Sequence, residues 1–80
     1  MRVQDILNEI AAQTPGTRPL TNMIGAMLNR TKIVSLDEDN ATMLKFMVVN
    51  YVTYRNPNDR VADLREARSI ATWLNTLVTS

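Results

Sequence analysis

The segment from Met43 to Tyr54 constrains the fold most, because apolar side chains lie on nearly every side of it. Only Lys45, Asn50 and Thr53 interrupt the apolar run. A helix that is apolar all round has to be covered by other helices or by another chain. We therefore expect a helix that is either the centre of the fold or part of a shared interface.

A strand is the alternative for part of this segment. Val48, Val49, Val52 and Thr53 are β-branched, which lowers helix propensity and suits a pleated sheet. The alternative fold is therefore α+β, with a strand over residues 46–54.

Amphipathic spacing predicts two helices before this segment. Apolar residues at i, i+3, i+4 and i+7 predict a helix over residues 3–13, which Pro15 and Gly16 end. Pro19 suits the first turn of a second helix over residues 19–30, because its missing N–H costs nothing there.

Capping residues mark the starts of the other two helices. Ser35 and Glu38 have the spacing of a capping box, which predicts that a third helix begins near residue 36 and that Ser35 is its N-cap. Asn58 or Asp59 can cap a fourth helix with a wide apolar stripe.

These patterns predict an all-α fold, a compact four-helix bundle built around the third helix. The expected helices cover residues 3–13, 19–30, 36–55 and 59–78. No linker, repeat or low-complexity stretch divides the chain, so we expect one helical domain over residues 1–80.

The chain is short enough to need help with stability. A domain of 80 residues buries only about 60 to 65% of the surface that its unfolded chain exposes. Because the chain contains no cysteine, neither a disulfide nor a thiolate zinc site can compensate. We therefore predict a homo-oligomer that associates through the third and fourth helices.

Composition argues against an enzyme. The chain has no histidine, the side chain best suited to proton transfer near neutral pH and a common metal ligand. Its serines would have only a lysine as base. We expect a non-catalytic protein without a cofactor or a metal site.

Charge argues against nucleic acids and membranes as partners. The net charge is only +1. The third helix would also begin with Asp37, Glu38 and Asp39, and this negative charge would be repelled by the phosphates of a nucleic acid. The apolar run is also shorter than the roughly 20 residues that span a bilayer, and no signal peptide is evident. We expect a cytosolic protein, and a DNA-binding accessory role is the weakest alternative.

The stretch from Tyr51 to Arg60 is the first candidate site. Tyr51, Tyr54 and Arg55 share one end of the third helix, and the turn that follows brings Arg60 near them. Aromatic faces, guanidinium groups and a helix start suit an anion that carries a planar ring. In the competing interpretation, Tyr51 lies in the core and the arginines pair with Asp59 and Asp63.

A second candidate is a polar seam on the fourth helix. Arg65 and Arg68 follow each other at helical spacing, and no acidic residue lies within the seam. The partner of Arg68 is either Asp5 or Glu9 of the first helix, or else a ligand phosphate or a carboxylate of another subunit.

Two functional hypotheses follow. In the first, the oligomer binds or sequesters a small anionic, nucleotide-like ligand through these tyrosines and arginines. In the second, an apolar helix face inhibits or adapts a host protein. In its short length, helix content and lack of cysteine, the chain resembles many accessory proteins of phages and mobile elements, which include anti-defence proteins.

Overall fold

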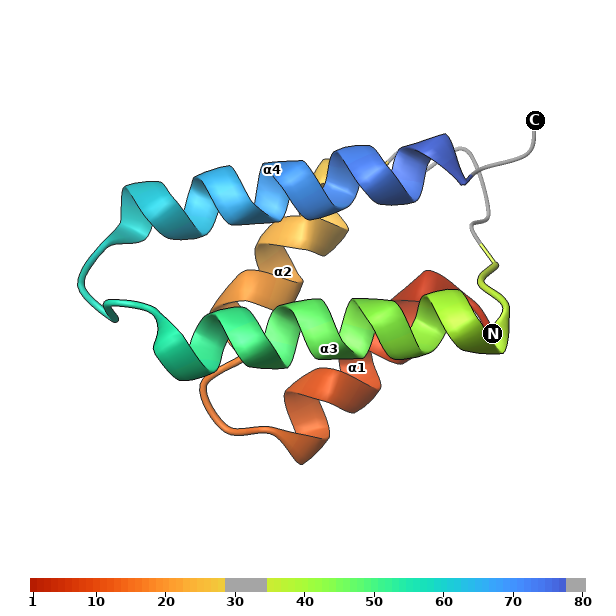
Figure 1. Ribbon diagram of the computed structural model, residues 1–80, viewed down its shortest axis with the longest axis horizontal. Coiled ribbons are helices and arrows are strands. Elements are labelled where there is room, and N and C mark those ends of the chain that lie inside the picture. The colour runs from red at the N-terminus through yellow and green to blue at the C-terminus, as the bar shows by residue number, and fades with distance from the viewer. Residues whose placement is uncertain (29–34, 78–80) are drawn as a thin grey trace.

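The computed structural model describes residues 1–28 and 35–77, which form four α-helices (Figure 1). The helices are α1 (Val3–Gln13), α2 (Arg18–Met27), α3 (Glu38–Tyr54) and α4 (Arg60–Thr76). The predicted all-α four-helix bundle is confirmed. The alternative strand over residues 46–54 is wrong, because these residues lie within α3.

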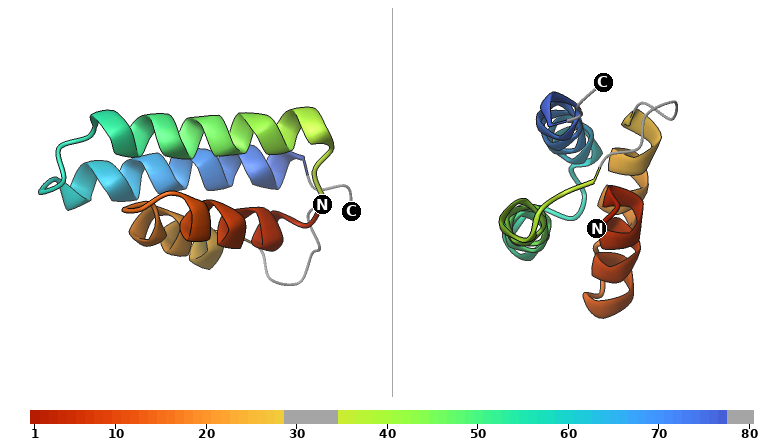
Figure 2. Two further views of the ribbon diagram at one scale, coloured as in Figure 1. Left: turned by 90° about the horizontal axis from the view of Figure 1, so that it is seen from below. Right: turned by 90° about the vertical axis from the view of Figure 1, so that its right-hand side faces the viewer.

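The four helices form two pairs. α3 and α4 run antiparallel along the length of the molecule, and α1 and α2 lie on one side of them (Figures 1 and 2). α2 packs against both α1 and α4, whereas α3 packs mainly against α1. The prediction that α3 forms the centre of the bundle is therefore wrong.

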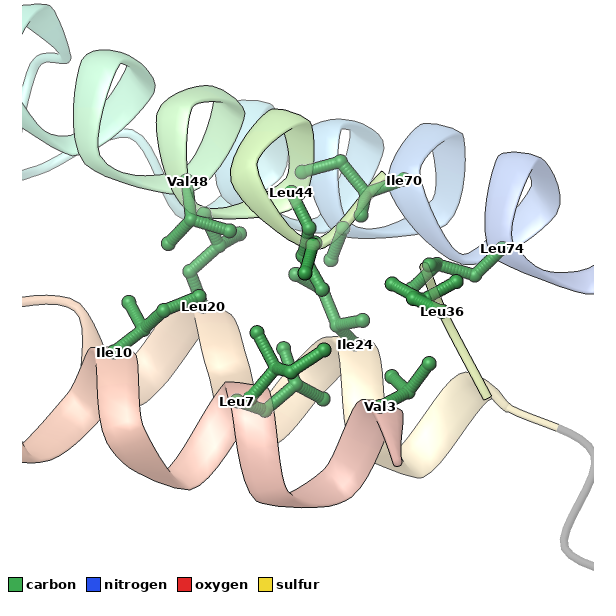
Figure 3. Close-up of a cluster of buried hydrophobic side chains, with 13 residues drawn as sticks. Val3, Leu7, Ile10, Leu20, Ile24, Leu36, Leu44, Val48, Ile70 and Leu74 are labelled. Atoms are coloured by element: carbon green, nitrogen blue, oxygen red, sulfur yellow. The ribbon is translucent and has the colours of Figure 1, made fainter. Parts of the chain in front are cut away.

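The core draws side chains from all four helices and from Leu36 (Figure 3). Ile6, Leu20, Ile24 and Leu44 are fully buried in it. α3 contributes only a narrow stripe, because its buried residues are Ala41, Leu44 and Val48 at helical spacing. One side of this apolar helix is therefore left outside the core.

The start of α3 differs from the prediction. Asp37, and not Ser35, is the N-cap, because its side chain accepts a hydrogen bond of 2.8 Å from the backbone N–H of Asn40. Ser35 instead forms an isolated β-bridge with Arg2. Leu36 accounts for the shift, because its side chain is buried and its backbone N–H donates a hydrogen bond of 2.8 Å to the carbonyl oxygen of Met1. This pairing holds the chain extended up to the cap.

The turn between α1 and α2 follows the predicted stop. Gly16 has a φ of 85°, the left-handed conformation that favours glycine. Thr17 is fully buried, and its hydroxyl donates to the carbonyl oxygens of Ile10 and Thr14. α2 ends at Met27, whereas its predicted end at residue 30 lies outside the described residues, as does the predicted end of α4 at residue 78.

Candidate functional site

Asp63 is the centre of a buried polar network between α3 and α4. It lies in the first turn of α4 and is only 4% exposed. The hydroxyl of Tyr51 donates to its Oδ1 at 2.9 Å, and Nη1 of Arg55 contacts its Oδ2 at 2.5 Å. Both carboxylate oxygens of Asp63 are therefore used, each by a residue of the preceding helix end.

Arg55 also connects this network to the turn between α1 and α2. Its Nη2 donates to the carbonyl oxygen of Gly16 at 3.3 Å. Arg55 is the C-cap of α3, and its side chain is only 13% exposed. One guanidinium thus contacts two chain segments that lie far apart in the sequence.

Local capping places Asp63 opposite Arg55. The turn between the helices contains a hydrogen bond of 3.0 Å from the Asn58 N–H to the Asn56 side chain. Asp59 then caps α4 by accepting from the N–H of Ala62 at 2.9 Å, as the sequence predicts. These contacts fix the elbow, which we define as residues 55–60.

The network also alters the acidity of Tyr51. Burial of the phenol, its hydrogen bond to Asp63 and the negative charge of that carboxylate raise the pKa of Tyr51 to about 12. Both the burial and the carboxylate disfavour a phenolate. Tyr51 therefore acts as a hydrogen-bond donor here and does not supply a base near neutral pH.

A depression of about 210 Å³ opens at this end of the molecule. Its lining combines side chains of α2, the elbow and α4, namely Pro19, Met23, Arg55, Pro57, Arg60 and Asp63. The charge of Arg55 is balanced by Asp63, whereas Arg60 is exposed. The depression thus combines three apolar side chains with the Arg55–Asp63 pair and one additional cation.

The structure brings together three of the six predicted site residues. Tyr51 and Arg55 meet at Asp63, and Arg55 and Arg60 line the depression. Tyr54 is 82% exposed and does not belong to the lining. Arg65 and Arg68 are exposed on α4, also away from the depression.

One of the two acidic partners suggested for Arg68 is used elsewhere. Glu9 pairs with Lys45 of α3 at 3.2 Å. In residues 1–28 and 35–77, the ion pairs are this one and the Arg55–Asp63 pair, so neither Arg65 nor Arg68 has an ionic partner within the described chain.

Sequence reasoning considered Asp63 only as a surface partner and missed its burial. A signal was present, because Asp63 precedes Ala67, Ile70 and Leu74 at helical spacing and so lies on the buried stripe of α4. Pro19 and Met23 of the depression, and the carbonyl of Gly16, carried no comparable signal. Their contact with the elbow depends on how α1 and α2 pack against the other two helices.

The described residues contain no cluster of three or more acidic side chains that could hold a metal ion. None of the helices in these residues is long and apolar enough to span a membrane.

The chain matches no protein-family model, and comparison with curated proteins and with solved structures also gives no match. The function is therefore inferred from the residues of this chain alone.

Proposed function

We propose that the protein is a non-catalytic binding protein whose elbow depression holds the anionic group of a small ligand. The observation that supports this proposal most is that Arg55 and Arg60 line one depression together with the apolar side chains of α2 and of Pro57. Guanidinium groups suit carboxylate and phosphate because they offer several N–H donors in a planar fork.

The two arginines have different parts in this proposal. Arg55 is held in place by Asp63 and Gly16, so little conformational entropy is lost when a ligand meets its remaining N–H donors. Arg60 is exposed and supplies the positive charge that Asp63 does not balance. Arg60 is therefore the residue on which affinity for an anion should depend most.

The size of the depression limits the ligand. About 210 Å³ is less than the roughly 300 to 1,000 Å³ of sites for drug-sized molecules. It suits a phosphate or carboxylate with a compact apolar group, and a nucleotide would place only its phosphate there. Sequestration of such a ligand is the physiological role that we propose, in line with the accessory proteins that the chain resembles.

A thermal-shift experiment with inorganic phosphate, AMP and a cyclic dinucleotide tests the proposal. A probe at 100 times its dissociation constant adds about 2.7 kcal/mol to the free energy of unfolding. For a probe that shifts the melting temperature, calorimetric titration should show that Arg60→Ala weakens binding about tenfold to hundredfold. The melting temperature of the unliganded variant should stay unchanged.

Arg65→Ala is the matched control, because it removes an exposed arginine from the same helix but outside the depression. It should bind each probe like the parent protein. The proposal is overturned if no probe raises the melting temperature, or if the two variants lose affinity equally.

A further inference from the structure

The charged side chains that line the elbow depression leave one net positive charge. Arg55, Arg60 and Asp63 all belong to the lining. The carboxylate of Asp63 pairs with the guanidinium of Arg55, so the charge of Arg55 is already balanced. Arg60 is exposed and supplies the one positive charge that remains for an incoming anion.

Two charged residues immediately adjoin the lining residues in the sequence, and their charges are opposite. Arg18 precedes Pro19, and Asp59 precedes Arg60. Together they add no net charge to this end of the molecule. The Cα atoms of consecutive residues are only about 3.8 Å apart, so the exposed carboxylate of Asp59 weakens the attraction of Arg60 for negative charge.

One unbalanced positive charge favours a ligand with one negative charge. A carboxylate or a phosphodiester carries a single charge, whereas a phosphate monoester carries nearly two above neutral pH. Arg60 can neutralise the first of these charges. The second would lose hydration and approach the carboxylates of Asp59 and Asp63 without an unbalanced cation to meet it.

The rest of the lining favours a compact apolar group next to the charge. Pro19 and Met23 belong to α2, and Pro57 belongs to the elbow. Two proline rings and a thioether chain present apolar surface without a side-chain hydrogen-bond donor. An aromatic ring or a small branched alkyl group can contact all three.

We infer that the elbow depression selects a singly charged anion, a carboxylate or a phosphodiester, over a doubly charged phosphate monoester. This inference rests on the proposed function, because it concerns the same site and names the class of ligand. Asp59 acts from outside the lining, since its negative charge lowers the affinity for a second charge on the ligand.

Three phenyl compounds test the effect of ligand charge at a constant ring. Phenyl phosphate carries nearly two negative charges at about pH 8, whereas methyl phenyl phosphate and benzoate carry one each. In calorimetric titrations, methyl phenyl phosphate should bind at least about fivefold more tightly than phenyl phosphate, the effect of one unit charge about 4 Å away in water. Tighter binding of benzoate than of methyl phenyl phosphate would identify a carboxylate as the source of the charge, and the reverse order would identify a phosphodiester.

Asp59→Asn tests the cause of the preference. Asparagine is also a good N-cap, so this variant should keep the start of α4 while it removes the negative charge next to Arg60. The preference for methyl phenyl phosphate over phenyl phosphate should fall about threefold.

Asp39→Asn is the matched control, because it removes an exposed carboxylate at the opposite end of α3 (Figure 1). Asp39 lies about 22 Å along the helix from Tyr54, the last residue before the elbow. This distance exceeds the screening length of about 10 Å in 0.1 M salt, so the preference should stay as in the parent protein.

The outcomes separate this inference from the proposed function. Phenyl phosphate that binds as tightly as methyl phenyl phosphate would overturn the charge selection, and so would an equal change of the preference in Asp59→Asn and Asp39→Asn. If Arg60→Ala still weakens binding in these cases, the proposed function stands without the selection. Absence of binding by all three compounds would overturn both.

Discussion

The two ion pairs of the described residues both join different helices, but their surroundings differ. Lys45 and Glu9 connect α3 to α1 through a single contact, and their side chains are 38% and 39% exposed. Arg55 and Asp63 are 13% and 6% exposed, and Asp63 also accepts a hydrogen bond from Tyr51. One pair is on the surface, and the other belongs to a buried network.

Burial changes what each pair contributes. An exposed pair is screened by water and typically contributes about 0 to 1 kcal/mol. A buried pair loses much of its attraction to the cost of desolvation, but removal of one partner leaves an uncompensated charge and costs about 3 to 5 kcal/mol. The Arg55–Asp63 pair therefore adds little net stability. Its main effect is to disfavour arrangements of the elbow that separate the two charges.

The largest expected effect comes from Asp63→Ala. This change leaves the Arg55 guanidinium without its carboxylate and the Tyr51 hydroxyl without its acceptor. We expect the free energy of unfolding to fall by about 3 to 5 kcal/mol, measured by urea denaturation. A chain of this size is expected to have only about 4 to 12 kcal/mol in total.

Asp59→Ala is the control for this prediction. Asp59 is exposed and caps the same helix, so its loss should cost only about 0.5 to 2 kcal/mol. Equal losses for the two variants would mean that the buried network is no more sensitive than a helix cap.

The next effect is a loss of stability at high pH. The pKa of Tyr51 is raised from 10.0 to about 12 in the folded protein, so unfolding makes the phenol easier to ionise. The stabilisation from this residue is complete below the unfolded pKa of about 10 and is lost as pH rises toward 12. Urea denaturation should show a steeper loss of stability between about pH 10 and 12 for the parent than for Tyr51→Phe. An equal loss of stability with pH in the two proteins would contradict the raised pKa of Tyr51.

A smaller effect is expected from Tyr51→Phe near neutral pH. The change removes one hydrogen bond to the Asp63 carboxylate but leaves Arg55 in place, so we expect a loss of about 1 to 2 kcal/mol. Tyr54→Phe is the control, because Tyr54 is 82% exposed and should change stability by less than about 0.5 kcal/mol. A loss of 3 kcal/mol or more would indicate that the hydroxyl, and not the ion pair, holds the network together.

The sequence was most informative where local chemistry decides the structure. The spacing of apolar residues predicted α1 as residues 3–13, the range that the structure shows. Asp59 was among the expected caps of α4. Periodicity, caps and turn residues act within a few positions of each other, so they can be read without knowledge of the packing.

The sequence was less informative where distant segments meet. Ser35 was a reasonable cap by spacing, but Leu36 pairs with Met1, which lies 35 residues earlier. The apolar content of α3 could not show which side is covered, and Phe46 is on the uncovered side. The burial of Asp63 likewise depends on Arg55 and Tyr51, which approach it only after the elbow has brought the end of α3 beside the start of α4.

The smallest effect is expected from Lys45→Ala, which breaks the surface pair with Glu9. Because both side chains are more than a third exposed, we expect a loss of about 0 to 1 kcal/mol that disappears in 1 M salt, where the screening length is about 3 Å. Glu9→Ala should give the same small loss, and the double variant should lose no more than either single variant. Urea denaturation at low and high salt measures these differences. A loss of 2 kcal/mol or more that persists in high salt would mean that packing of the Lys45 stem matters more than its charge.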